Sequence, residues 1–126
     1  MKRKATTVTD FDSMETEYLA SALEWGHYQS QRNFRAGNSA ATKLEKLGKQ
    51  LRENTMGQES ILRLMTHESD FVKVWAAKDG LMCVPDQALE VLKCIGSQPG
   101  LLGTSARTVI SEWESGALFK PTPKSV

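Results

Sequence analysis

Residues 70–81 constrain the fold more than any other part of the chain. Their sequence, DFVKVWAAKDGL, forms on a helical wheel a helix that is apolar around almost its whole circumference. The polar strip of that helix is narrow and contains Lys73, Asp79 and Gly80, while Lys78 falls inside the apolar arc. A helix with so little polar surface must be covered by other helices on several sides. The sequence therefore predicts a stack of helices with this one in the middle.

The apolar periodicity elsewhere in the chain is also helical, and no segment shows strand-like alternation. Two long amphipathic segments come first, and the short connection between them predicts an antiparallel hairpin over residues 9–54. Gly26 interrupts the first of these helices at a cost in helix propensity, which indicates a bend or a close helix contact. We expect an all-α protein of about six helices, near residues 9–32, 38–53, 57–66, 69–82, 85–96 and 103–115.

The second half of the chain repeats. An apolar cluster at residues 61–65 returns twenty-seven residues later at residues 88–92. This spacing predicts two helix pairs, over 57–83 and 85–116. The last helix has a single narrow apolar face, which suits the end of a stack. One helical-repeat domain over residues 9–116 is therefore expected, arranged as a right-handed superhelix of helix pairs, with flexible tails at 1–8 and 117–126.

The charge is balanced along the chain. Sixteen basic and fifteen acidic residues give a formal net charge of +1, and neither half of the chain carries an excess of one sign. Binding to nucleic acid or to a membrane surface relies on a surface of one sign, so neither is expected. The basic start of the chain is followed by polar residues, and no apolar run approaches the ~20 residues of a membrane span. We expect a cytoplasmic protein.

Residue patterns typical of catalysis, metal binding or cofactor binding are missing from the sequence. His27 and His67 lie in different segments and have no further ligand at metal-binding spacing. Cys83 and Cys94 are interpreted as small buried apolar residues of a reducing compartment. We therefore expect no enzyme activity, no metal and no cofactor.

Residues 69–77 resemble the second helix of a HEAT repeat, in which a polar turn leads into a Val-basic-x-x-Ala-Ala helix. Residues 57–116 also resemble a small bacterial family of unassigned function. Its members share the VWAA, PxxALxVL, GLLGxSA and EW motifs, found here at 74–77, 85–92, 100–106 and 112–113. The resemblance implies a HEAT/ARM-like superhelix and brings no catalytic residues.

Three functions are compatible with these features. The first is a non-catalytic protein-binding module, for example an adaptor or an immunity or antitoxin protein, because superhelices present extended binding surfaces. The second is a HEAT-like nucleic-acid-binding protein, supported by the basic run Lys43, Lys46, Lys49 and Arg52, and the third is a small enzyme. A toxin gene beside this one would favour the first.

The expected interaction surface of the first function lies around Lys78 and the turns at His67 and Ser97. Lys78 is chosen because a charge inside an apolar arc either reaches past it to water or points into a groove. The residues expected to mark the core are Trp75, Ala77, Leu81 and Trp113.

Overall fold

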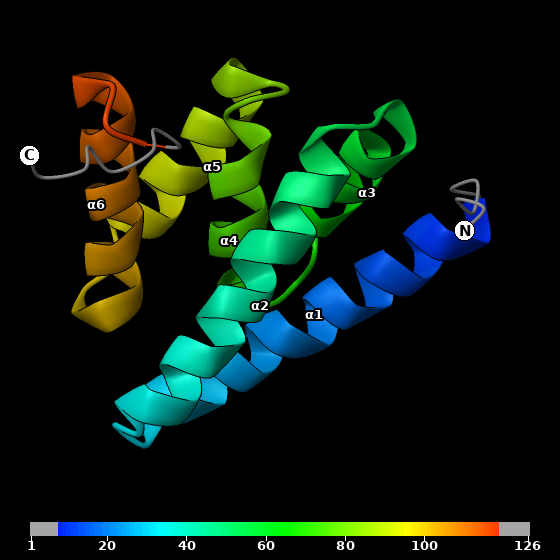
Figure 1. Ribbon diagram of the computed structural model, residues 1–126. Helices are drawn as coiled ribbons and strands as arrows, with labels where there is room; N and C mark the ends of the chain where they lie inside the picture. The colour runs from blue at the N-terminus through cyan, green and yellow to red at the C-terminus, as the bar shows by residue number, and fades with distance from the viewer. Residues whose placement is uncertain (1–7, 119–126) are drawn as a thin grey trace, which may run out of the picture.

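The structure, a computed structural model, describes residues 8–118 and consists of six helices (Figure 1). The flexible tails expected at 1–8 and 117–126 fall almost entirely on residues 1–7 and 119–126, which lie outside this range. No strand occurs within residues 8–118, so the prediction of an all-α protein of six helices is confirmed. The helices are α1 (Val8–Ser30), α2 (Phe34–Arg52), α3 (Thr55–Met65), α4 (Asp70–Gly80), α5 (Pro85–Gly96) and α6 (Gly100–Ser115).

Helix α4 is the centre of the molecule and contacts each of the other five helices. In Figure 1 it lies between α5 and α6 on one side and the α1–α2 hairpin on the other. The central position predicted from its apolar circumference is therefore confirmed. The predicted polar strip is wrong for Asp79 and Gly80, which are both buried. Helices α1 and α2 cover Asp79, whereas Met65 of α3 and Ala88 of α5 lie against Gly80. Lys73 remains partly exposed.

The expected core residues fall into two groups. Ala77 and Leu81 are buried, whereas Trp75 and Trp113 pack against the core while remaining partly exposed. The rest of the core is formed mainly by leucine, isoleucine, valine and alanine side chains from all six helices, together with Phe11 and Tyr18 of α1. The apolar stripes of the sequence thus meet around α4.

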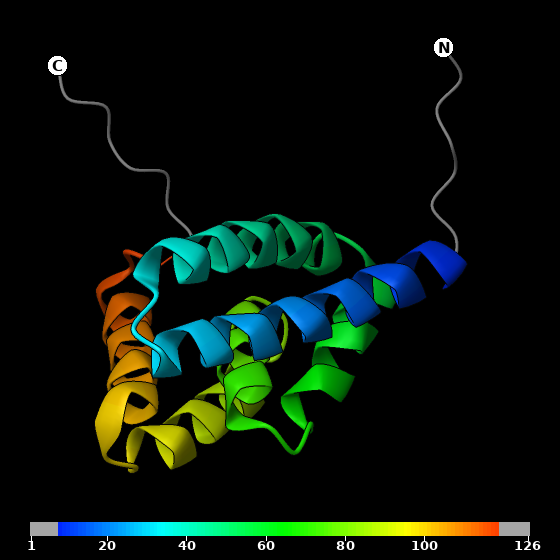
Figure 2. The same cartoon turned by 90° about the horizontal axis from the view of Figure 1, so that it is seen from below.

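Helices α1 and α2 form the expected antiparallel hairpin and lie side by side across the other helices (Figure 2). The predicted start of the second helix at residue 38 is wrong, because α2 already begins at Phe34. The side chain of Asn33 caps it, its Oδ1 accepting a hydrogen bond from the Ala36 N–H at 3.3 Å. The close contact predicted at Gly26 is confirmed, since a Cβ there would lie 2.5 Å from Cγ of Phe71 in α4.

Two other helices also start earlier than expected. Helix α3 starts at Thr55, and α6 starts at Gly100, so residues 100–103 form its first turn. Within residues 8–118, no helix is long and apolar enough to cross a membrane.

Candidate functional site

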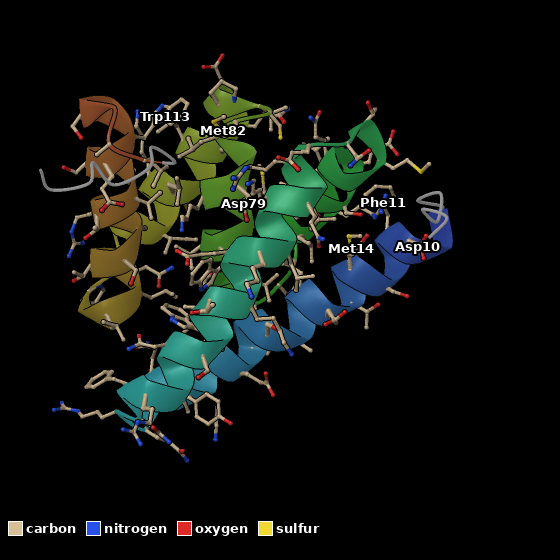
Figure 3. All side chains as sticks on the ribbon, in the orientation of Figure 1. Asp10, Phe11, Met14, Asp79, Met82 and Trp113 are labelled. Atoms are coloured by element: carbon tan, nitrogen blue, oxygen red, sulfur yellow. The ribbon has the colours of Figure 1, made fainter. Side chains whose placement is uncertain are left out.

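Among the residues that the structure describes, the only buried residue with an acidic or basic side chain is Asp79, which is 3% exposed (Figure 3). Its Oδ2 accepts a hydrogen bond from the hydroxyl of Tyr18 at 2.5 Å, and its Oδ1 accepts one from Nη1 of Arg52 at 2.5 Å. We call these three residues the Asp79 cluster. It joins α1, α2 and α4 at the centre of the protein. Because Tyr18 is completely buried and the Asp79 side chain is 4% exposed, the cluster holds helices together and leaves only part of Arg52 accessible to solvent.

Gly48 of α2 makes room for this cluster. A Cβ at position 48 would lie 2.7 Å from Cγ of Asp79, so any larger residue would overlap the carboxylate. Burial raises the pKa of the Asp79 carboxyl, and the Tyr18 hydroxyl and the Arg52 guanidinium lower it in part. Burial and the neighbouring Asp79 charge raise the pKa of Tyr18 well above its ordinary value.

The raised pKa of Tyr18 predicts a loss of stability in alkali. The unfolded chain releases the tyrosine proton near pH 10, whereas the folded chain retains it. The contribution of the Tyr18 hydroxyl to the free energy of unfolding is therefore complete below about pH 10. Above that pH it decreases, by up to about 1.4 kcal/mol per pH unit. Tyr18→Phe should be about 1–2 kcal/mol less stable at neutral pH but should lack this alkaline term. The two free energies of unfolding, measured with urea, should converge as the pH rises above 10, and a constant difference would contradict the buried pair.

A second feature is a hollow of about 250 Å³ between α1, α4 and α6. Its aromatic wall is formed by Trp25 and Trp75, whose rings are nearly perpendicular with centroids 5.6 Å apart. Lys78 lies at this wall with its Nζ 4.8 Å from the centroid of Trp75. We call this the indole hollow. Its remaining lining residues are Val74, Thr104, Ser105, Thr108, Val109 and Glu112.

A third feature is an open groove of about 840 Å³ between α3 and α5, with the start of α4 between them. We call it the α3–α5 groove. Its apolar lining comes from Leu62, Met65, Val91 and Ile95. The polar residues around these are Thr66, Asp70, Lys73, Gln87, Glu90, Cys94 and Gln98.

The cysteines differ from expectation. Both are free thiols, but Cys94 is exposed and Cys83 is only partly buried. The prediction that both are buried apolar residues is therefore wrong. The reason is that Cys94 points into the α3–α5 groove, which no described segment covers.

The three positions expected to form one interaction surface, His67, Lys78 and Ser97, do not lie together. The turns of His67 and Ser97 lie at the start of α4, whereas Lys78 lies near its end. The turn before this helix contains His67, whose Nδ1 accepts a hydrogen bond from the Ser69 N–H. The turn that contains Ser97 reaches the same end of α4, because Nε2 of Gln98 donates a hydrogen bond to Asp70 at 2.8 Å. Lys78 lies eight residues further along α4, about 12 Å away at the helical rise. It belongs to the indole hollow, and the two turns lie near the α3–α5 groove.

The sequence pattern singled out Lys78 but did not reveal which side chains from other helices lie beside it. Its Nζ lies 3.7 Å from Oε2 of Glu45, which belongs to α2. The sequence pattern also did not reveal the Asp79 cluster, although an aspartate within a helix that has almost no polar face was a signal for it.

No group of three or more histidine, cysteine, aspartate or glutamate side chains in the described part of the chain could hold a metal ion.

Comparisons of the chain with protein-family models, with curated proteins and with solved structures found no match.

Proposed function

We propose that the protein is a non-catalytic module that binds another protein, with the HEAT/ARM-like superhelical arrangement that its sequence resembles. The α3–α5 groove carries this proposal. It combines an apolar floor with a polar rim, the arrangement with which protein interfaces exclude water at their centre. Sequential packing of α3 on α4, α4 on α5 and α5 on α6 supports the repeat arrangement. The free thiols of Cys83 and Cys94 suit the cytoplasm.

The groove favours an amphipathic helix as the bound element of the partner. Two helices flank it, and Leu62 and Val91 provide accessible apolar contacts for side chains on one face of a partner helix. On the rim, Asp70 is already engaged by Lys73 and Gln98. The carboxylate of Glu90 is exposed and has no partner among the described side chains, so a lysine or arginine of the partner helix would pair with it.

The placement of the basic residues of α2 weakens the alternative that the protein binds nucleic acid. Of the basic run on α2, Arg52 turns inward to the buried Asp79 carboxylate. Lys43, Lys46 and Lys49 remain exposed, but three cations beside Glu45 and Glu53 do not form the extended basic surface that phosphate binding requires.

Replacing Leu62 with glutamate tests the groove. The protein, tagged and used as bait in an extract of the cells that produce it, should retain a partner that Leu62→Glu loses. Because Leu62 is 37% exposed, the variant should unfold at nearly the same temperature as the parent. Leu23→Glu is the matched control, since Leu23 of α1 is 43% exposed and lines none of the hollows described above.

Two outcomes would overturn the proposal. One is a partner that Leu62→Glu retains as well as the parent does, which would place binding elsewhere. The other is retained material that disappears on nuclease treatment and with added salt, which would favour nucleic-acid binding.

A further inference from the structure

The wall of the indole hollow consists of two large aromatic side chains that remain partly accessible to solvent. Trp25 comes from α1 and Trp75 from α4, and Phe71 packs on Trp25 from behind with ring centroids 6.1 Å apart. Both indoles are only partly buried, although they pack against the core. Val74 of α4 and Val109 of α6 continue the apolar surface. Two perpendicular indoles between aliphatic side chains form a surface suited to a flat apolar group.

Two charged residues, Lys78 and Glu112, line this hollow, and the less exposed of the two is the cation. Lys78 is 19% exposed and lies over Trp75, whereas its acidic neighbour Glu45 is 63% exposed and approaches it from outside at 3.7 Å. A pair of this length with an exposed partner is weak. Glu112, the other acid at the hollow, is exposed on α6, where water and salt screen its charge. An incoming carboxylate can therefore take the place of Glu45 at the Lys78 ammonium.

Size limits the ligand to a small one. A cavity of about 150 Å³ accommodates a benzene ring. The indole hollow, at about 250 Å³, has room for one ring and a short arm but not for a cofactor such as a dinucleotide. From the wall, the charge and the volume we infer that the indole hollow binds a small aromatic carboxylate, with its ring against Trp25 and Trp75 and its carboxylate on Lys78. This site is independent of the α3–α5 groove and of the proposed function.

The indole N–H resonances of ¹⁵N-labelled protein report binding directly. Phenylacetate, used as the probe, should shift the resonances of Trp25 and Trp75 in a saturable way and leave that of Trp113 in place, because Trp113 does not line the hollow. Phenylacetamide, which has the same shape without the charge, should bind roughly tenfold more weakly. Phenethylammonium, which reverses the charge, should not bind.

Two substitutions assign the charge recognition to Lys78. Lys78→Met keeps the stem over Trp75 but removes the ammonium, so it should weaken phenylacetate binding roughly tenfold and leave phenylacetamide binding unchanged. Lys73→Met is the matched control on the same helix, because Lys73 pairs with Asp70 and lies outside the hollow. Glu45→Gln removes the competing carboxylate and should strengthen phenylacetate binding roughly twofold.

Three results would overturn the inference. The first is equal binding of phenylacetate and phenylacetamide to the parent protein. The second is an equal loss of phenylacetate binding in Lys73→Met and Lys78→Met, which would mean that the net charge of the protein, and not a contact with Lys78, attracts the carboxylate. The third is tighter binding of a peptide ending in phenylalanine than of phenylacetate, which would assign the site to a chain terminus and not to a small molecule.

Discussion

Asp79→Ala should lower the free energy of unfolding by about 3–5 kcal/mol, the cost of breaking a buried ion pair by removing one partner. The substitution leaves the completely buried Tyr18 hydroxyl without its acceptor and takes from Arg52 the carboxylate that lies 2.5 Å from its Nη1. It also removes a contact that joins α1, α2 and α4. Urea unfolding at neutral pH, followed by circular dichroism, measures the change.

A second variant separates charge from hydrogen bonding at this position, and a third, elsewhere on the surface, is the control. Asp79→Asn keeps an oxygen that can accept from Tyr18, and burial already disfavours the charged form of Asp79. It should therefore cost less, about 1–2 kcal/mol. Glu24→Ala, an exposed acid on α1, should change stability by less than about 0.5 kcal/mol. Equal stability of Asp79→Ala and the parent would show that the Asp79 cluster is not formed in solution.

Gly48→Ala should destabilise the protein by about 2–3 kcal/mol, although alanine is the better helix former. Its methyl group would overlap the Asp79 carboxylate, which cannot move away because Tyr18 and Arg52 hold its two oxygens. Gly37→Ala on the same helix is the control. There the closest neighbour of the new methyl group is the end of the flexible Gln29 side chain, and Tyr28 lies at an ordinary contact distance, so the change should be neutral or slightly stabilising.

A double-mutant cycle makes the Gly48 prediction specific to the Asp79 cluster. In the Asp79→Ala background the carboxylate is gone, so Gly48→Ala should cost nothing or stabilise by up to about 1 kcal/mol. The effects of the two substitutions should therefore be strongly non-additive. Additive effects would mean that the methyl group at position 48 is excluded by something other than Asp79.

The number and order of the helices could be predicted from the sequence, but the starts of α2, α3 and α6 could not. Periodic apolar residues identify a helix and its inward face, whereas a helix start depends on one or two polar contacts. The second helix begins at Phe34 and not at residue 38 because Asn33 caps it. The sixth helix includes residues 100–103, although two of these four residues are glycines, which have low helix propensity.

Of the candidate sites, the sequence indicated only single residues. Lys78 stood out because it interrupts an apolar arc, but its contact with Glu45 and the neighbouring Trp25 come from other helices. The α3–α5 groove could not be foreseen, since it depends on α3 and α5 flanking the start of α4 without closing over it. Cys94 is exposed for that reason.

The sequence by itself determined that this protein is helical and that α4 lies at its centre, because a helix apolar around its circumference is stable only when other helices cover it. Only the tertiary structure decided how the polar residues of that helix are satisfied. A helical wheel gives the direction of Asp79 but not what covers it. Its partners Tyr18 and Arg52 are 61 and 27 residues away in the chain. Their meeting depends on how α1 and α2 pack across α4, which no local pattern contains.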